Sequence, residues 1–302
     1  MQVIETTRAL QARADRARTA GRRIALVPTM GALHAGHLTL ISEARKRADP
    51  VFVSIFVNPT QFNEASDFDQ YPRVLEDDLA RCREAGVDAV FAPPVAELYP
   101  DGATTWVDVE GLTEPLCGAS RPGHFRGVTT VVAKLLVAAR PHVAVFGEKD
   151  FQQLAVVRRM ARDLGFDVEI VGVPTVREPD GLALSSRNEH LGPEARGQAT
   201  ALVRALDAAE QAAAEGERDR DRLLAGVREV LAGAPLAEID YAELRDAETL
   251  ELAPAGLAGP TVLALAVRFP ARHGGDPVRL IDNRVILRPG TKAVAEARKE
   301  ER

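Results

Sequence analysis

Cysteine is scarce in this chain of 302 residues, which contains only Cys82 and Cys117. Two cysteines are too few for a disulfide framework, and we expect both thiols to be inert in a reducing cytoplasm. Long apolar runs are also missing, because no stretch approaches a membrane span and the first residues lack the apolar core of a signal peptide. These absences predict a cytoplasmic globular protein with no membrane partner.

An excess of basic charge is the second thing missing. The formal net charge is -6 and the isoelectric point is about 5.6, which makes a nucleic-acid partner unexpected. Neither a Walker loop nor a GxGxxG fingerprint occurs, so the main sequence evidence for a P-loop protein or a dinucleotide-binding protein is missing. Hydrophobic residues make up 46% of the chain, which is enough for a full core. The length of the chain predicts two domains.

The most informative stretch runs from Ile24 to Ile41. A short apolar run predicts a buried strand, which we expect Pro28 to end because proline has no N–H to donate. Gly31 allows a tight turn, and a helix follows from about Gly36. A helix start presents unpaired N–H groups and a partial positive charge, which suit a phosphate. His34 and His37 lie three residues apart at this start, so both rings can face one ligand.

These histidines have two other interpretations. They could be zinc ligands, but no nearby Cys, Glu or third His completes a site. They could also be ordinary surface residues near a turn. Because two of only six histidines fall in one glycine turn after a buried strand, the polyphosphate site is favoured.

Alternating strands and helices organise the first half of the chain, which predicts a Rossmann-like parallel sheet with right-handed crossovers. In such a sheet, ligands bind at the carboxyl ends of the strands. Strands are expected at 24–27, 51–57, 87–92, 142–146 and 168–173, with a short one at 105–109, and helices at 1–23, 36–44, 73–85, 128–139 and 150–164.

The second half has a different pattern, with two helices followed by three strands, which predicts a smaller α+β domain with antiparallel pairing. Helices are expected at 193–214 and 218–232, and strands at 239–244, 261–268 and 278–287. The fold class is therefore α/β, with domains at 1–175 and 176–288 and a frayed, disordered tail at 289–302.

Two further turns have anion-binding chemistry. Gly147, Glu148, Lys149 and Asp150 follow the fourth predicted strand, and Lys149 can act as a mobile positive charge. After the fifth strand, Leu184-Ser-Ser-Arg-Asn188 offers two hydroxyls and a guanidinium that can bind an anion bidentately. A solvated lysine or a helix cap would explain either turn alone. Three such turns at successive strand ends favour a shared anion site.

Four motifs together resemble the pantothenate synthetase (pantoate–β-alanine ligase) family of double-histidine nucleotidyltransferases. They are Met30–His37, Val57–Phe62, Gly147–Gln153 and Leu184–Asn188, and the similarity runs from about Val27 to Leu287. The resemblance implies condensation of pantoate with β-alanine at the cost of ATP, through a pantoyl adenylate, with release of AMP and pyrophosphate. It also implies a Mg²⁺ requirement and a homodimer.

Residue roles follow from chemistry and from the resemblance together. Preorganised donors are expected around the α-phosphorus, and the resemblance makes His37 the proton donor. Gln61 and Gln153 are expected to bind the hydroxy acid, although a glutamine in a loop or helix is usually solvated. The expected catalytic residues are His37, His34, Lys149 and Arg187; the expected ATP-binding residues are Met30, Gly31, Ala32, Leu33, His34, Ala35, Gly36, His37, Gly147, Glu148, Lys149, Asp150, Val176, Leu184, Ser185, Ser186 and Arg187.

A metal site and a lid are the least specific expectations. Asp77 and Asp78 could help to hold Mg²⁺, but adjacent acids on a helix more often form a solvated face. The long polar stretch 63–77 directly after Gln61 suggests a lid, because a reactive acyl adenylate must be kept from water.

Other functions stay open at this point. An adenylyltransferase of the same superfamily would pass AMP to a phosphate acceptor, and a nucleotide sensor would bind ATP without releasing pyrophosphate. A tRNA synthetase is disfavoured because the chain is acidic and shows no separate basic domain.

Overall fold

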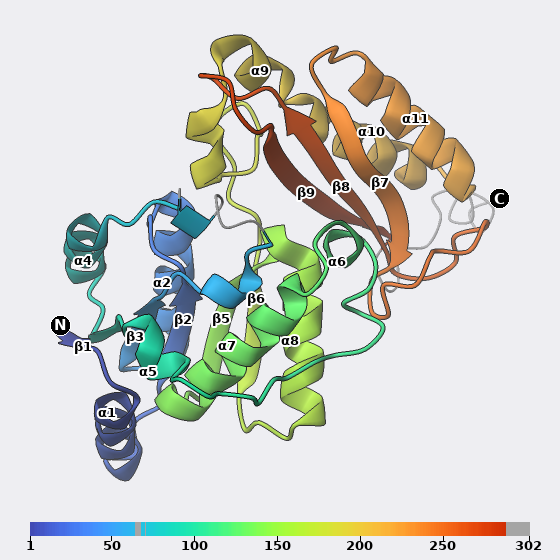
Figure 1. The fold of residues 1–302 in the computed structure, drawn as a ribbon. Helices are drawn as coiled ribbons and strands as arrows, with labels where there is room; N and C mark the ends of the chain where they lie inside the picture. Colours follow the sequence, from blue (N-terminus) through green and yellow to red (C-terminus); the bar gives the residue numbers. More distant parts are fainter. Residues whose placement is uncertain (64–67, 70, 288–302) are drawn as a thin grey trace. The chain divides into compact units, whose positions relative to one another are not determined.

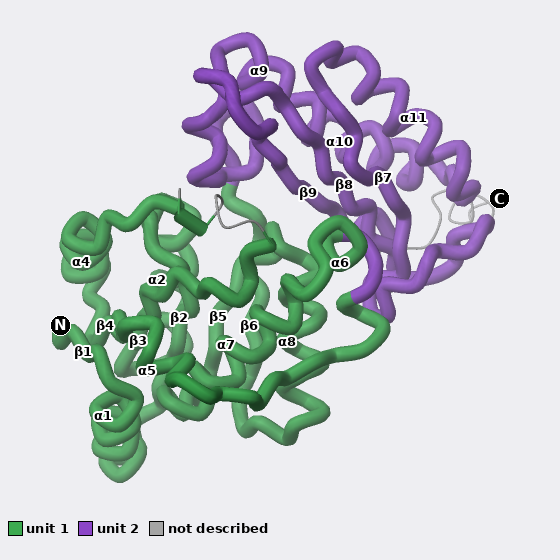
Figure 2. The backbone as a smooth tube through the Cα atoms, viewed as in Figure 1, with its two compact units in different colours: residues 1–113, 117–176 green, residues 114–116, 177–302 purple. Residues whose placement is uncertain are grey.

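The computed structural model describes residues 1–63, 68–69 and 71–287, and it divides into two compact units (Figures 1 and 2). The first unit contains residues 1–113 and 117–176, and the second contains residues 114–116 and the chain from Arg177 onward. The predicted tail at 289–302 lies outside the described residues. Within the described part of the chain, no helix is long and apolar enough to cross a membrane.

A six-stranded parallel sheet with helices on both faces forms the first unit (Figure 1). The order is β1-β4-β3-β2-β5-β6. The strands are β1 (Gln2–Ile4), β2 (Ala25–Thr29), β3 (Val51–Ile55), β4 (Ala89–Phe91), β5 (Val143–Gly147) and β6 (Glu169–Val173). From β2 the chain proceeds through β3 and β4 in one direction and through β5 and β6 in the other. The sheet therefore changes winding direction between β2 and β5, where parallel sheets form their ligand crevice.

Alternate strand residues face opposite helical layers. Val27, Val53 and Val145 share one buried cluster with apolar residues of α2 (Ala35–Arg47) and α4 (Leu75–Glu84). On the other face, Leu154 of α8 (Phe151–Asp163) packs against Gly172 of β6. The remaining helices are α1 (Thr7–Thr19), α5 (Val95–Leu98), α6 (Cys117–Ser120) and α7 (His124–Ala139), with 3₁₀ turns η1 (Pro59–Gln61) and η2 (Glu148–Asp150).

The second unit is an antiparallel sheet, in the order β7-β8-β9, with helices packed on it. The strands are β7 (Glu238–Asp246), β8 (Thr261–Phe269) and β9 (Val278–Leu287). The helices are α9 (Pro193–Gln198), α10 (Ala201–Ala214) and α11 (Arg220–Ala232), and η3 spans Ser186–His190. Leucine and alanine from α10 and α11 form one buried cluster with inward residues of all three strands. The predicted α+β class is confirmed.

Four local predictions need correction. β1 was missed because a three-residue run cannot be separated by pattern from the helix that follows it. No strand forms at 105–109. The helix expected at 193–214 is interrupted between Gln198 and Ala201, so it forms α9 and α10. Pro28 does not end its strand.

The behaviour of Pro28 has a structural consequence. β2 pairs with β3 as far as Thr29↔Ile55, but its pairing with β5 stops at Leu26↔Ala144. The Thr29 hydroxyl donates to the Ser54 carbonyl at 2.7 Å and holds the end of β2 on the β3 side. Because proline lacks an N–H, β2 parts from β5 near its carboxyl end while it stays paired to β3.

Candidate functional site

The turn after β2 delivers both histidines to the start of α2. Gly31 has φ +88° and Ala32 has φ +51°, so the chain turns through two successive left-handed residues before the helix begins. His34 is the N-cap residue, and its Nδ1 accepts from the Gly36 N–H at 3.1 Å. The His37 Nδ1 accepts from the His34 N–H at 3.2 Å, which completes a capping box made of imidazoles. The two rings therefore satisfy helix-terminal N–H groups that would otherwise lack partners.

This cap sets the chemistry of the rings. An Nδ1 that accepts a hydrogen bond carries no proton, so the neutral ring is protonated on Nε2 and presents an N–H donor there. The ring centroids of His34 and His37 lie 4.2 Å apart. Burial first, and then the neighbouring His34 and Lys149, lower the pKa of His37 to about 3, while Asp150 opposes them. His37 is therefore neutral at physiological pH in the ligand-free protein.

Glycine is required at two positions of this turn. A Cβ on Gly36 would lie 2.8 Å from Cε1 of His34, against the ring that caps the helix. A Cβ on Gly31 would lie 2.9 Å from an Asp78 carboxylate oxygen and 3.1 Å from the Ile55 side chain. Close packing accounts for both glycines of the motif, and at Gly31 the left-handed backbone conformation adds to it.

The second predicted anion turn lies beside the first. It follows β5, the strand paired with β2, and carries Lys149 and Asp150 on η2. Both residues act electrostatically on the His37 imidazole. The fold thus brings His37 and Lys149, which are 112 positions apart in sequence, near one another at the point where the sheet changes direction.

Gln61 is buried rather than solvated, with 9% of its surface exposed. It ends η1, directly after β3, and its Oε1 accepts from Asn58 Nδ2 at 3.0 Å. Its Nε2 lies 3.1 Å from Sδ of Met30, the first residue of the histidine motif. Gly127 of α7 lets η1 approach, because a Cβ there would lie 2.4 Å from the Thr60 carbonyl oxygen. The amide of Gln61 is therefore fixed beside the histidine turn.

Two adjacent glutamines on α8 have different roles. Gln152 is buried, and its amide accepts from the Cys117 N–H at 3.1 Å and donates to the Leu112 carbonyl at 2.9 Å. Gln153 is half-buried, and its amide makes no hydrogen bond with the residues that the structure describes. The structural role of Gln152 was not predicted, since adjacent glutamines look alike in sequence. Gln153 keeps the binding capacity that its predicted role needs.

The third turn belongs to the second unit. Ser185 caps η3, where its Oγ accepts from the Arg187 N–H at 3.3 Å, and the Arg187 side chain is exposed. Asn188 is buried, and its Nδ2 donates to Glu178 at 2.6 Å and to the Ala183 carbonyl at 3.1 Å. Among the described residues, the Asn188 Oδ1 is the buried side-chain polar atom that lacks a partner. Asn188 thus ties η3 to the preceding loop.

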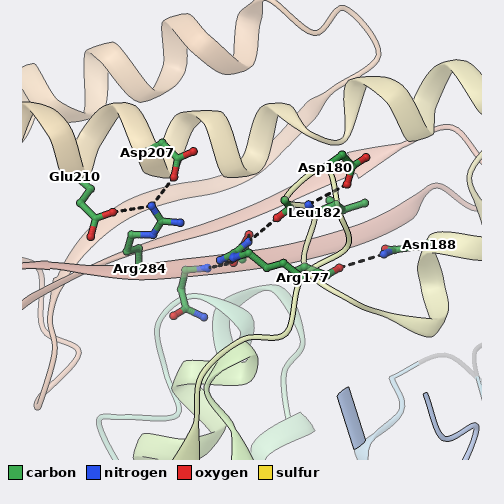
Figure 3. A network of polar contacts seen from close by, with 11 residues as sticks. Arg177, Asp180, Leu182, Asn188, Asp207, Glu210 and Arg284 are labelled. Atoms are coloured by element: carbon green, nitrogen blue, oxygen red, sulfur yellow. Dashed lines mark hydrogen bonds and ion pairs between the residues drawn. The ribbon is translucent and has the colours of Figure 1, made fainter. Parts of the chain in front are cut away.

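Charged pairs fix that loop to the sheet of the second unit (Figure 3). Arg177 makes a bidentate pair with buried Asp282 of β9, at 2.6 and 3.0 Å, and also donates to the Gly181 carbonyl at 3.0 Å. Arg196 of α9 binds Glu178 at 2.6 Å and Asp180 at 2.7 Å. These pairs, which sequence reasoning missed, preset the backbone that precedes the Leu184–Asn188 motif. The partners lie 105 positions apart for Arg177 and Asp282 and 16 to 18 apart for the pairs of Arg196, so no short motif signals them.

The proposed metal ligands differ sharply from each other. Asp77 is exposed, as expected of a solvated helix face. Asp78 is 1% exposed, and its two oxygens accept from the Ala32 N–H at 2.9 Å and the Leu33 N–H at 2.7 Å. In the described ranges, no group of three or more His, Cys, Asp or Glu could hold a metal ion. Among the described residues, Asp77 and Asp78 therefore have no third ligand of these types beside them.

A parallel α/β unit with polar turns at its switch point belongs to the class of proteins that bind their ligands at strand carboxyl ends. Within that class the comparisons are specific. The family model described as pantoate-beta-alanine ligase matches residues 2–285, and the chain belongs to this family.

Individual relatives agree with the family match. Pantothenate synthetase of Geobacter sulfurreducens is 55% identical over 287 residues, which cover 95% of this chain and 99% of that protein. A pantothenate synthetase crystal structure from Thermus thermophilus superposes with a TM-score of 0.87 at 47% identity, covering 95% of this chain and 99% of that one. The pantoate-beta-alanine ligase of Francisella tularensis, described as complexed with beta-gamma ATP and beta-alanine, gives a TM-score of 0.75 at 32% identity and covers 95% and 98% of the chains.

Proposed function

We propose that this protein is an ATP-dependent ligase that condenses pantoate with β-alanine to pantothenate, through a pantoyl adenylate, with release of AMP and pyrophosphate. Family membership and the names of its close relatives support the overall reaction. The observations that support the site assignment are the direct pairing of β2 with β5 and the electrostatic effect of Lys149 on the His37 ring.

The first step needs charge stabilisation more than covalent chemistry. A pantoate carboxylate oxygen attacks the α-phosphorus of ATP, the bond to the bridging oxygen breaks, and pyrophosphate leaves with its electron pair. Negative charge on the phosphate oxygens is met by donors, of which His34, His37 and Lys149 lie in the first unit. Ser185, Ser186 and Arg187 are proposed to add donors, as the family resemblance implies. A single preorganised donor of this kind is worth about 3 kcal/mol.

The state of His37 suits this step. A neutral ring with its proton on Nε2 donates a hydrogen bond without repelling Lys149. A bound triphosphate raises the pKa of the ring, because nearby negative charge favours the imidazolium. The ring therefore gains proton-donating capacity when the nucleotide is present, in line with the role that the family resemblance implies.

The amides of Gln61 and Gln153 are proposed to bind pantoate. Neutral amides can hold hydroxyl and carboxylate oxygens without placing another charge beside the attacking group. Orientation of this kind is worth up to roughly 7–11 kcal/mol in favourable cases. In the second step the β-alanine amine attacks the acyl carbon of the adenylate, the bond from that carbon to the phosphate oxygen breaks, and AMP leaves while the amine loses a proton.

Three finer properties stay proposals. Mg²⁺ is expected to arrive on the oxygens of the triphosphate, since it commonly binds through substrate phosphates and water. A homodimer in the cytoplasm is inferred from the family resemblance and from the cysteine content. The proposed lid at 63–77 includes residues 64–67 and 70, which lie outside the described residues.

The test separates the two half-reactions. Protein, MgATP and pantoate are mixed, and pyrophosphate is measured before β-alanine is added; AMP and pantothenate are measured afterwards. The proposal expects up to one equivalent of pyrophosphate per site in the first phase, and sustained AMP and pantothenate in the second. An adenylyltransferase would release no AMP in response to β-alanine, and a nucleotide sensor would release no pyrophosphate in either phase.

A further inference from the structure

Asp78 makes contacts that a metal ligand would not need. Its carboxylate is buried and faces the histidine turn, and each oxygen accepts one backbone N–H, from Ala32 at 2.9 Å and from Leu33 at 2.7 Å. Hydrogen bonds to a carboxylate are among the stronger ones in proteins. Two consecutive N–H groups are therefore held by one side chain from α4.

Asp78 binds the part of the turn that has the least favourable backbone conformation. Ala32 has φ +51°, a left-handed conformation that is unfavourable for a residue with a Cβ. Met30, Gly31 and Asp78 also border a cavity of about 260 Å³ lined largely by apolar side chains such as Ile55 and Leu75. Because the turn faces a cavity on that side, packing alone does not support it there.

The restrained segment leads directly into the imidazole cap. Leu33 is buried in the core, and the next residue, His34, is the N-cap of α2. His34 in turn fixes His37 through its backbone N–H. A shift of the Ala32–Leu33 peptide would therefore move both rings, and a displacement of about 1 Å at a reacting centre can cost about 100-fold in rate.

We infer that Asp78 is a positioning residue for the double-histidine turn, acting through the Ala32 and Leu33 N–H groups, and that it is not a ligand of Mg²⁺. This inference rests on the proposed function only for its kinetic readout. Asp78 is 1% exposed and each of its oxygens already accepts a backbone N–H, so its carboxylate is engaged with the turn and is not open to a hydrated Mg²⁺.

The experiment compares Asp78→Asn with Glu76→Gln. Asn keeps the size of Asp but places an NH₂ group against one backbone N–H. Glu76 is exposed in the same first turn of α4, so its variant removes an equal charge from the same helix end and serves as a control. Three quantities are measured: the histidine ring NMR signals of the ligand-free protein, kcat at saturating substrates, and the Mg²⁺ concentration for half-maximal rate.

For Asp78→Asn, the inference expects a kcat at least tenfold lower, a half-saturating Mg²⁺ concentration within twofold of the parent, and altered ring signals of His34 and His37. Glu76→Gln should match the parent in all three. A tenfold rise in half-saturating Mg²⁺ with unchanged ring signals would make Asp78 a metal ligand and overturn the inference. Unchanged kcat and ring signals would overturn it as well.

A second variant guards against misfolding. Asp78→Glu retains both acceptor oxygens but moves them by one methylene, so it should lower kcat less than Asn does and leave the Mg²⁺ response unchanged; a changed Mg²⁺ response would contradict the inference. If the parent protein forms no pantothenate, the proposed function fails, whereas the ring signals of the ligand-free protein still test the role of Asp78.

Discussion

The backbone N–H of His34 donates to Nδ1 of His37 at 3.2 Å, so the first histidine of the motif sets the protonation pattern of the second. The pair behaves as one unit in which the Nδ1 of each ring accepts a backbone N–H at the start of the helix. Two amide variants can separate this capping role of His37 from the donor role proposed for its Nε2.

Replacement of His37 by Asn or by Gln should give different outcomes. Asn places an acceptor near the Nδ1 position and can keep the cap, but it has no donor at the Nε2 position. Gln reaches toward the Nε2 position and loses the cap. We expect kcat to fall by about 100-fold or more in Asn, on the scale of a lost transition-state donor, with an unchanged Tm. Gln should keep more activity and lose about 1 kcal/mol of stability, as for a lost N-terminal cap interaction. Steady-state kinetics and thermal unfolding check both; a Tm loss in Asn equal to that in Gln would refute the separation of roles.

The pH dependence of stability should carry the signature of His37. Its pKa is about 3 in the folded protein and 6.5 in the unfolded chain, so the unfolded chain binds more protons between these values. Stability should therefore fall as the pH drops below 6.5 and stop falling, for this group, near pH 3. Between about pH 7.5 and about pH 4.5 the loss from this ring should be about 2–3 kcal/mol.

Urea unfolding of the parent and of His37→Asn at the two pH values measures this loss. Other titrating groups affect both proteins, so their contributions cancel in the difference. An identical pH response in the two proteins would show that the ring of His37 is not held neutral by the fold.

Lys149→Met should affect both catalysis and the neighbouring ring. Lys149 lowers the pKa of His37, so removal of its charge should raise that pKa while burial continues to hold it below the ordinary value. The loss of the positive charge beside the triphosphate should lower kcat/KM for ATP by about 100-fold or more, the scale of one lost charge-stabilising donor. NMR titration of the His37 ring and initial-rate kinetics provide the two measurements. An unchanged ring pKa together with a normal rate would place Lys149 outside the site.

Gly127→Ala should disturb Gln61 without touching substrate. The new methyl group would lie 2.4 Å from the Thr60 carbonyl oxygen and 2.8 Å from the Gln61 backbone nitrogen, so η1 must move. We expect a loss of about 1–3 kcal/mol of stability, as for other overpacked sites, and a raised KM for pantoate. Unfolding curves and pantoate titrations check this.

Gly226→Ala is the matched control, because it also lies inside a helix, α11, and its Cβ would meet no atom within 4 Å. Relative to glycine, alanine favours a helix interior by about 0.5–1 kcal/mol, so this variant should be slightly more stable and fully active. Equal behaviour of the two alanine variants would show that the approach of α7 to η1 is not tight.

Most of the helices and strands could be predicted from the sequence, because the spacing of apolar residues along a short segment reflects which of its residues are buried. The runs at Val51 and Val143 predicted β3 and β5 to within two residues, and the later change in pattern predicted the antiparallel unit. The same reasoning missed β1, whose three residues become a strand only because β4 offers an edge. It also misjudged Pro28, because a missing N–H matters on the β5 side of the strand and not on the β3 side.

The sequence predicted those properties of the candidate site that depend on residue type alone. Glycines, imidazoles, a lysine and a hydroxyl-rich turn indicated an anion site, and the four motifs indicated the family. The surroundings of each side chain were not visible. Gln152 and Gln153 are neighbours with the same side chain, yet the amide of Gln152 holds a loop and that of Gln153 makes no hydrogen bond with the described residues.

The sequence by itself determined which residue types follow each strand, because the order of neighbouring residues does not depend on how the chain folds. Only the tertiary structure decided that β2 pairs with β5, that His37 is neutral, and that Asp78 faces backbone N–H groups. Each of these depends on burial and on partners distant in sequence, and a carboxylate or an imidazole acquires its role from the atoms that surround it after folding.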